Sequence, residues 1–412
     1  MASQPFPRRS VNSPRTTLVL FTITGFVESL AFGHLGVFTP LFLQQLRVPQ
    51  SSIGYWTGLL SALGFVIGIP LLPFWAVWAH RFGRKPLIIR SSVVEAILFT
   101  IAAFSQNVYM LAVARFLVGF VLGNTGIMMS VQADITPKER IGTALSIVSS
   151  GSPVGMAAGP YLGGLLVSRI GIRNLLLIDS GLTMLVVFML LIFLKEEPIQ
   201  IESDADDKLP GVIELLGDVV RIPIVALLFG CTFIMVLGIN IAQPFLPILV
   251  QQLHHGAGLP VAIGAVSTGS GLAMAIATPW WGWIGDRIGH ARSLRGCGSM
   301  VGLALISQAT ATSVLAVGLW RVTQGLFQSG IGTLVAVLLA TASPSDRRVS
   351  VLTLSLLPQQ IAWFFGPLIG AAIVQGSLKA VFLAAGFTVA AGSLMTLFVH
   401  LTMKPSHLAA SE

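Results

Sequence analysis

The chain contains twelve stretches of mostly apolar residues, each long enough to cross the hydrocarbon core of a membrane as a helix of about 20 residues. A membrane interior offers no water to backbone amide and carbonyl groups, so a spanning segment must be a helix or a strand of a closed barrel. Barrel strands alternate apolar and polar residues, and these stretches do not. The sequence therefore predicts an all-α membrane protein with 12 transmembrane helices. The stretches lie near residues 17–43, 53–79, 87–105, 108–131, 141–168, 173–194, 222–250, 260–284, 292–310, 314–340, 349–374 and 379–402.

The distribution of charge predicts how the chain is oriented. Lys and Arg outnumber Asp and Glu by 24 to 16. If the N-terminus is cytoplasmic, the outer loops contain only Arg47, Arg169, Arg173 and Lys379 of these basic residues. Because positive residues accumulate on the cytoplasmic side, we expect a multi-pass protein of the cell membrane with both termini in the cytoplasm. The basic excess is then an orientation signal and does not indicate a nucleic-acid partner.

Three motifs occur twice, separated by about half of the 412-residue chain. Such a duplication predicts two pseudo-symmetric six-helix bundles with a ligand site between them. The longest polar connection lies at the midpoint, so the predicted units are residues 1–195, a cytoplasmic linker 196–221 and residues 222–412. The repeated motifs are Trp78–Lys85 with Ile284–His290, Arg115-x-x-x-Gly119 with Arg321-x-x-x-Gly325, and Gly159-Pro160-x-x-Gly163 with Gly366-Pro367-x-x-Gly370.

Two motifs give the chain a family resemblance. The loop Ala79-x-Arg81-x-Gly83-Arg84-Lys85 is similar to the loop signature of the major facilitator superfamily. The string Gly155-x-x-x-Gly159-Pro160-x-x-Gly163-Gly164 resembles the signature of that family's antiporters without departure. Over roughly residues 15–402, the chain therefore resembles the twelve-span drug:proton antiporter branch of the family. The resemblance implies two bundles that rock around a central cavity, and the glycine string suits close helix contact.

The resemblance also implies a conformational latch in the loop after the second span of each half. In the family, an Asp of this loop faces the amino end of a helix in the other half, which is a favourable charge–dipole contact. This chain has His80 at that position, and Ala76 where the signature has Gly. A neutral His80 weakens the contact and a protonated one opposes it, so we expect a weakened first-half latch. The latch residues are His80, Arg81, Gly83, Arg84 and Lys85 in the first half, and Asp286, Arg287 and Gly289 in the second.

Glu28, Glu95 and Arg115 are charged residues within predicted spans. A charge inside a span is costly and marks a functional position. At about 1.5 Å per residue, Glu28 and Arg115 lie at nearly the same depth, which predicts that they are partners. Related exporters carry a proton-binding acid in the region of Glu28, so we expect Glu28 to bind the coupling proton and Arg115 to tune its affinity. Glu95 either shares this role or makes a hydrogen bond to a neighbouring helix.

Two further charged residues near or within spans receive different expectations. Asp179, near the outer end of the sixth span, is expected to belong to the membrane interface with Arg173. Arg321 mirrors Arg115 in the second half, but its half offers no obvious acid at membrane depth, so its partner is left unassigned.

Polar and aromatic residues in the second half predict a wide, amphipathic substrate pocket that includes Glu28 from the first half. Such a pocket suits lipophilic or cationic small molecules. Each of these residues has an alternative role in helix–helix hydrogen bonding or packing. The expected substrate-binding residues of the second half are Asn240, Gln243, Gln324, Gln359, Trp363 and Phe364.

Several motifs of catalysis are absent from the sequence. It contains no Gly-x-x-x-x-Gly-Lys-[Ser/Thr] phosphate loop, no His-Glu-x-x-His zinc signature and no Gly-x-Ser-x-Gly elbow. We therefore expect no enzyme activity, no metal and no cofactor, and a monomer whose partners are a small-molecule substrate, protons and membrane lipid. By the resemblance, the function is proton-driven export of hydrophobic or amphipathic molecules. The alternatives are a sugar, lipid or metabolite exporter on the same fold and, from another class, a transport-inactive sensor or intramembrane enzyme.

Overall fold

The computed structural model describes residues 13–121, 123–195, 221–344, 347, 351–352 and 354–402, without the side chains of residues 72, 73, 76, 77, 80 and 400–402. Every regular element in this part of the chain is a helix. The predicted linker lies outside it, apart from residue 221. The helices of the first half are α1 (Pro14–Gln45), α2 (Gln50–Phe82), α3 (Arg84–Ala103), α4 (Val108–Leu117), η1 (Val118–Phe120), α5 (Asn124–Ile135), η2 (Lys138–Arg140) and α6 (Ile141–Phe193). Those of the second half are α8 (Pro223–Ala242), η3 (Gln243–Phe245), α9 (Leu246–Leu253), α10 (Leu259–Ile288), α11 (His290–Thr310), α12 (Val314–Ala342), α14 (Leu356–Val374) and α15 (Leu378–Thr402).

The twelve predicted spans all have counterparts among the described residues. Ten helices or helix runs there are long and apolar enough to cross a membrane. One of them, α6, reverses direction at Gly171 (φ 82°, ψ 166°), and its two arms match the predicted spans 141–168 and 173–194. The twelfth is α11, whose polar first turns lower its hydropathy. The prediction of an all-α membrane protein with twelve transmembrane helices is therefore confirmed.

Equivalent helices in the two halves begin with equivalent caps. Asn107 accepts a hydrogen bond from the backbone N–H of Met110 at the start of α4 (2.9 Å), and Ser313 accepts one from Ala316 at the start of α12 (3.2 Å). A cap of this kind satisfies one of the backbone amides that a helix start leaves unpaired. The capping function has been kept in both copies of the repeat although the residue differs.

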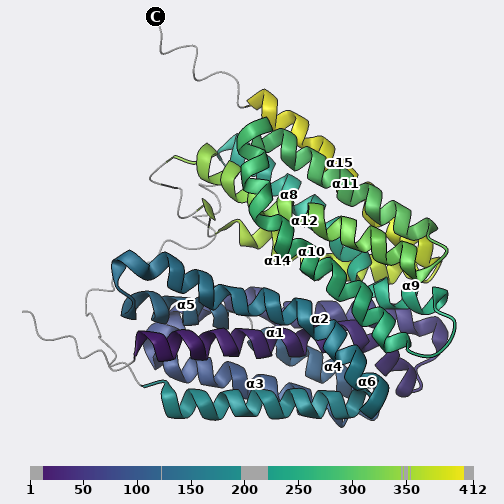
Figure 1. The fold of residues 1–412 in the computed structure, drawn as a ribbon, viewed down its shortest axis with the longest axis horizontal. Coiled ribbons are helices and arrows are strands. Elements are labelled where there is room, and N and C mark those ends of the chain that lie inside the picture. Colours follow the sequence, from purple (N-terminus) through teal and green to yellow (C-terminus); the bar gives the residue numbers. More distant parts are fainter. Residues whose placement is uncertain are drawn as a thin grey trace, which may run out of the picture.

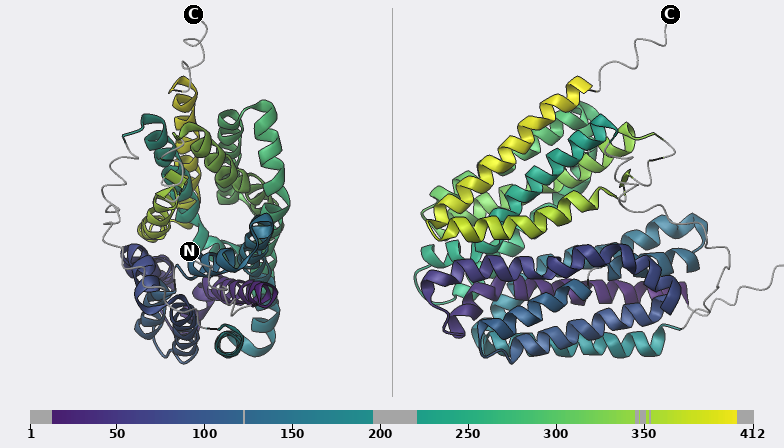
Figure 2. Two further views of the ribbon diagram at one scale, coloured as in Figure 1. Left: turned by 90° about the vertical axis from the view of Figure 1, so that its left-hand side faces the viewer. Right: turned by 180° about the vertical axis from the view of Figure 1, so that it is seen from behind.

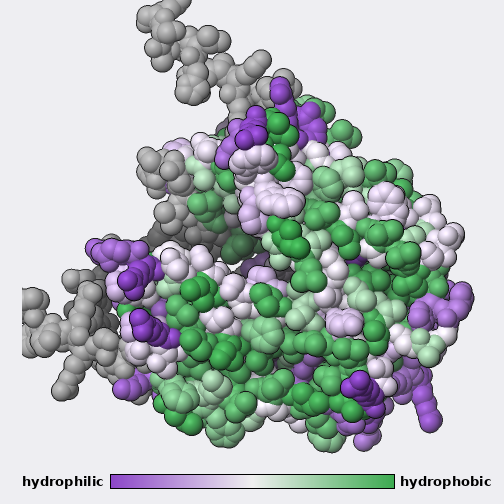
Figure 3. All heavy atoms as spheres, in the orientation of Figure 1, coloured by the Kyte–Doolittle hydropathy of each residue, from purple (hydrophilic) through white to green (hydrophobic). Residues whose placement is uncertain are grey.

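The helices form two bundles that diverge from a shared contact. In Figure 1, α1 to α6 form the lower bundle and α8 to α15 the upper one, and the view from behind in Figure 2 shows the same divergence. The bundles meet near the end of α1 and at α9, which we call the closed end. They are apart where α1 begins and α6 ends, which we call the open end. Figure 3 shows a hollow between the bundles on this side of the molecule.

Two pseudo-symmetric helix crossings join the bundles. Helix α6 packs on α10, and α14 packs on α2. At the first crossing, a Cβ atom on Gly264 would collide with the carbonyl oxygen of Pro160. At the second, a Cβ atom on Gly58 would collide with the carbonyl oxygen of Pro367. Because glycine has no side chain, the backbones approach closely at both crossings.

Apolar side chains cover the flanks of both bundles, as expected for surfaces that face lipid. Figure 3 shows this apolar surface across the middle of the molecule, with hydrophilic residues gathered toward its edges. Large apolar side chains with more than half of their surface exposed include Phe188 and Ile192 on α6, Leu315 and Leu319 on α12, and Phe387 and Leu394 on α15. A soluble protein would not leave so much apolar surface unpartnered.

Candidate functional site

A cavity of about 340 Å³ lies inside the first bundle, between α1, α2, the α4–α5 region and α6. Two of its lining residues are charged, and they are the predicted proton-coupling residues Glu28 and Arg115. The lining residues are Glu28, Ser29, Phe32, Leu60, Ser61, Gly64, Phe65, Arg115, Val118, Val121, Gly123, Asn124, Thr125, Ser152 and Met156. The cavity is therefore amphipathic, since apolar residues and glycines share its wall with seven polar or charged residues, and a concave site of this kind can hold a small molecule.

Glu28 is buried and accepts a hydrogen bond from the side-chain amide of Asn124 (Nδ2 to Oε1, 2.6 Å). Asn124 is the first residue of α5 and follows a helix break at Gly123 (φ 98°). This backbone conformation favours glycine, and a Cβ atom there would also lie 3.0 Å from the ring of Trp75. The break thus positions Asn124 toward α1. Sequence reasoning missed Asn124, although an amide directly after a glycine inside an apolar span was an available signal.

Arg115 does not pair with Glu28, and the predicted partnership is wrong. Its guanidinium donates to the backbone carbonyl of Leu35 (2.7 Å) and to the hydroxyl of Thr39. Leu35 lies about two helical turns, or about 10 Å, from Glu28 along α1. Pro40 follows this turn, and a proline inside a helix removes one backbone hydrogen bond. Arg115 therefore holds α1 beside its proline while still bordering the cavity.

Glu95 on α3 is fully buried (0% exposed), and neither carboxyl oxygen has a hydrogen-bond partner within the part of the chain that the structure describes. The alternative that it bonds to a neighbouring helix is therefore wrong. Glu28 and Asp179 are both near enough to interact electrostatically with it. Three acidic side chains from α1, α3 and α6 thus share the interior of the first bundle.

Asp179 pairs with a residue that the sequence analysis did not single out. Its carboxylate oxygens lie 2.8 and 3.0 Å from Nδ1 of His34 on α1, and both side chains are buried. The expectation that Asp179 belongs with Arg173 is wrong, since Arg173 donates to the backbone carbonyl of Ser105 (2.9 Å). A histidine in an otherwise apolar span was the signal that could have identified His34.

In the second bundle, Arg321 has amide partners. It donates to the side-chain oxygens of Gln324 (2.9 Å) and Gln243. Gln324 also accepts from Gln308 (2.9 Å) and donates to Gln328 (3.1 Å). This network gives Arg321 the partner that the sequence left unassigned, and it engages two residues expected to bind substrate.

The other expected substrate residues differ in what they contact. Asn240 donates to the carbonyl of Val236 in its own helix (2.8 Å), and Gln359 donates to that of Ser355 (3.4 Å). Trp363 reaches across to the first bundle, where its ring centroid lies 5.8 Å from that of Phe65, a residue of the cavity wall. The ring of Phe364 packs on its neighbour Phe365 (4.9 Å between centroids). Among these four residues, Trp363 is thus the one whose described contact is with a residue of the cavity wall.

The residues of the predicted latch make contacts within their own bundles. Arg84 pairs with Asp134 at the end of α5, and Lys85 donates to the carbonyl of Leu191 (3.5 Å). Gly83 (φ 86°) forms the turn between α2 and α3, and Arg81 lies over the ring of Phe82 (5.5 Å).

The latch loop of the second half has a similar arrangement. Gly289 (φ 91°) forms the turn between α10 and α11, Asp286 lies 3.2 Å from His290, and Arg287 lies over the ring of Trp283 (3.8 Å). The side chain of His80 lies outside the described part, so the weakened latch stays a prediction.

The glycine string of α6 contacts two helices. A Cβ atom on Gly155 would collide with the carbonyl of Phe26, and one on Gly159 would lie 2.7 Å from that of Leu30. One turn further, the same face contacts α1 at Gly163, while Gly164 meets the carbonyl of Pro260 on α10. The string therefore packs α6 against α1 within its bundle and against α10 of the other bundle.

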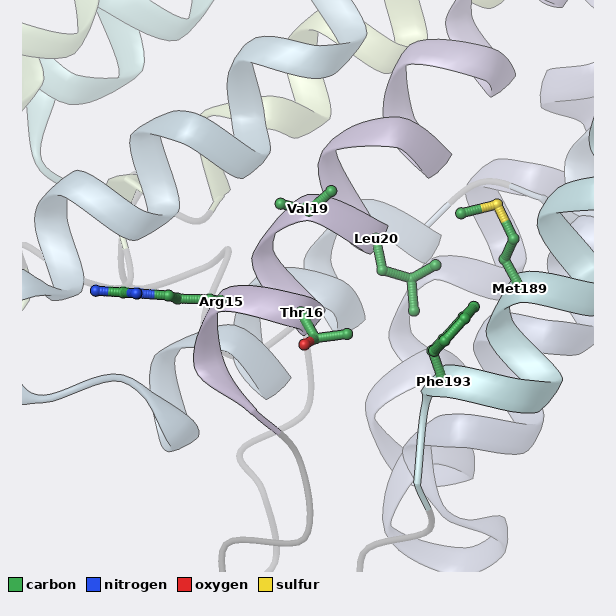
Figure 4. Close-up of a pocket in the computed structure, with 6 residues that line it drawn as sticks. All are labelled: Arg15, Thr16, Val19, Leu20, Met189 and Phe193. Carbon is green, nitrogen blue, oxygen red and sulfur yellow. The ribbon is translucent and has the colours of Figure 1, made fainter.

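A second cavity, of about 380 Å³, lies at the open end between the start of α1 and the end of α6. Figure 4 shows Val19, Leu20, Met189 and Phe193 on its apolar side, with Arg15 extending away from them. None of the predicted site residues lines it. We assign no role to this cavity.

Comparison with known proteins identifies relatives over nearly the whole chain. A family model described as Major Facilitator Superfamily matches residues 21–259 and 228–412. The chain is 26% identical over 367 residues to the Multi-drug resistance efflux pump PmrA of Streptococcus pneumoniae, covering 89% of this chain and 91% of that protein. It is 27% identical over 352 residues to the Multidrug resistance protein MdtG of Rahnella sp., covering 84% of each.

Two solved structures share the fold at low sequence identity. The crystal structure of the nucleoside transporter NupG superposes with a TM-score of 0.73 at 13% identity, covering 95% of this chain and 100% of that one. A bacterial homologue of the human lysosomal transporter Spinster, in an inward-facing and unoccupied conformation, also gives a TM-score of 0.73, at 16% identity and 96% coverage of both chains.

Proposed function

Since this chain belongs to the major facilitator superfamily, we propose that it exports hydrophobic or amphipathic small molecules in exchange for protons. The observation that carries the proposal is the buried Glu28 carboxyl group in the wall of an amphipathic cavity. The names of two relatives, the multi-drug resistance efflux pump PmrA and the multidrug resistance protein MdtG, support this substrate class. The family and its neighbours are transporters, which agrees with the expectation that the chain is not an enzyme.

Glu28 has the properties required of a group that exchanges protons with a cavity. An ionised carboxylate inside a membrane protein needs a compensating partner, and Asn124 supplies one hydrogen bond. When Glu28 is protonated, the same amide can donate to its carbonyl oxygen, so neither state leaves the Asn124 donor unpaired. A cationic substrate entering the cavity would stabilise the ionised form and promote release of the proton.

The two bundles provide the alternation of access in this proposal. Residues 1–195 and 222–412 would move as two units about the crossings at Gly264–Pro160 and Gly58–Pro367. The open end carries basic residues, including Arg84, Lys138 and Arg292, and positive residues favour the cytoplasmic side. The described form is then inward-open. The protein spans the cell membrane in this proposal, with both termini in the cytoplasm. The likeness to a structure with an inward-facing conformation supports this assignment.

Everted membrane vesicles test the proposal. An imposed proton gradient, acidic inside, should drive uptake of a lipophilic cation such as ethidium, and a protonophore should abolish it. Vesicles with an Asn174→Ala variant serve as a control, because Asn174 is exposed and bonds only to its own helix among the contacts described. Gradient-independent uptake would remove proton coupling. Proton-driven uptake of a sugar, lipid or hydrophilic metabolite, in vesicles that do not take up ethidium, would favour the alternative cargo.

A further inference from the structure

His34 and Asp179 form a buried pair that the role of Glu28 does not use. His34 is 2% exposed and Asp179 0% exposed, and Nδ1 of the imidazole contacts both carboxylate oxygens. The other ring nitrogen of His34, Nε2, is buried and has no hydrogen-bond partner among the described residues. The imidazole can therefore accept a proton at Nε2 without breaking its contact with Asp179.

The surroundings of this pair carry more acidic than basic groups. Glu95 on α3 interacts electrostatically with Glu28 and Asp179, and its own oxygens have no hydrogen-bond partner in the described ranges. Arg115 on α4 is also buried, and its Nη2 donates to Leu35 and Thr39. Glu95 therefore has two other carboxyl groups within electrostatic range, and carboxylates that are ionised together in a low-dielectric interior repel one another. A proton bound in this part of the bundle lowers that repulsion.

One residue of the glycine string, Gly163, lies against the imidazole of His34. A Cβ atom on Gly163 would lie 2.5 Å from Cδ2 and 3.0 Å from Nε2 of His34. The adjacent residue, Gly164, contacts Pro260 of the other bundle. The residue of α6 that lies against His34 is therefore the chain neighbour of the residue that contacts the other bundle.

We propose that the His34–Asp179 pair is a second proton-binding site, separate from Glu28 and set against the helix that joins the bundles at the closed end. The proton binds at Nε2 of His34, which converts a neutral imidazole beside a carboxylate into an ion pair of zero net charge. The site rests on the proposed proton-coupled transport for its role, but its titration does not depend on a substrate. Because Gly163 touches the ring and Gly164 touches α10, the charge of the ring and the packing of the bundles are linked.

Histidine titration by nuclear magnetic resonance tests the site directly. The chain has seven His residues, and protein labelled with ¹⁵N-histidine in nanodiscs reports the charge of each ring. His34→Gln and, separately, His34→Asn assign the His34 signal, while His255→Gln on the exposed loop is the matched control. Spectra are recorded over a pH series on both sides of neutral, and the proposal requires that the His34 ring change between its neutral and charged forms within it. In Asp179→Asn, the ratio of charged to neutral His34 should fall about tenfold or more, because an adjacent opposite charge has been removed.

Two outcomes overturn the site. One is a His34 ring whose charge state is constant over this pH range, and the other is a titration that Asp179→Asn does not move. If both His34 variants fail to fold, single His→Gln variants at the other positions assign the signal by elimination.

The transport experiment fails in a different way. If ethidium uptake is independent of the proton gradient while His34 titrates as expected, the proposed function is wrong and the proton site stands. If uptake is gradient-driven while His34 does not titrate, the proposed function stands and the proton site is wrong. If uptake is gradient-driven and His34 titrates, His34→Gln should lower the number of protons moved per ethidium, whereas His255→Gln should leave this number unchanged.

Discussion

Asn124 donates a 2.6 Å hydrogen bond to Glu28 from the first turn of α5, immediately after the glycine break in the fourth span. The contact joins two helices that border the cavity. The residue that follows the break at Gly123 is therefore the residue that binds the carboxyl group of Glu28.

Replacing Asn124 by Ala should weaken the ionised form of Glu28. A hydrogen bond to a charged group contributes about 1.5–3 kcal/mol, and a change of about 1.4 kcal/mol corresponds to one pH unit. Because the lost donor stabilised the carboxylate, the pH at which ethidium uptake is half-maximal should move upward by about one unit or more. Uptake measured across a pH series in everted vesicles checks this, with Asn174→Ala as the control. An unchanged profile would mean that the contact does not influence coupling.

Gly123→Ala should destabilise the protein. The residue has a φ of 98°, where a side chain costs about 1–3 kcal/mol, and its Cβ would meet the ring of Trp75. Gly126→Ala on the same helix is the matched control, because its Cβ would meet nothing within 4 Å. Thermal unfolding of purified protein should show a lower midpoint for Gly123→Ala than for Gly126→Ala. Equal midpoints would count against the helix break.

Gly264→Ala should open the closed end. The added methyl group would collide with the carbonyl of Pro160 and separate α10 from α6. A cysteine at position 61 in the cavity wall, in a background without Cys231 and Cys297, reports access from the outside through labelling by an impermeant maleimide. Labelling should rise in Gly264→Ala and stay at the parent level in Gly282→Ala, whose Cβ would be free. A rise in both variants would show that the effect is not specific to the crossing.

Arg115→Lys separates support of α1 from control of Glu28. Both bonds to Leu35 and Thr39 come from Nη2 of Arg115. A lysine keeps the positive charge, but its ammonium lies one bond nearer the backbone and falls short of these two acceptors. We expect a loss of stability of about 1.5–3 kcal/mol and an unchanged pH dependence of ethidium uptake. Should the pH profile move while stability is retained, Arg115 would act on Glu28 after all.

The sequence predicted the helices well because the membrane leaves a spanning chain few choices. Even the turn inside α6 was expected, since the spans 141–168 and 173–194 bracket Gly171. The close packing expected of Gly155 and Gly159 is also present. These features depend on local composition, which a single sequence contains in full.

Side-chain partners were predicted poorly, because depth in the membrane does not determine which way a residue faces. Arg115 and Glu28 have similar expected depths, yet Arg115 contacts a different turn of α1. Asp179 and Arg173 are six residues apart, which places them on different faces of a helix with 3.6 residues per turn. The true partner, His34, is distant in sequence and is brought near only by the packing of α1 on α6.

Proton release on substrate binding is the most direct measurement of the link between Glu28 and transport. Purified protein in weakly buffered detergent solution is mixed with ethidium, and a pH-sensitive dye records the protons released. The wild-type protein should release protons, and Glu28→Gln should still bind ethidium, as seen by its fluorescence, but release fewer. Equal release from the two proteins at equal occupancy would contradict the assignment of Glu28 as the coupling group.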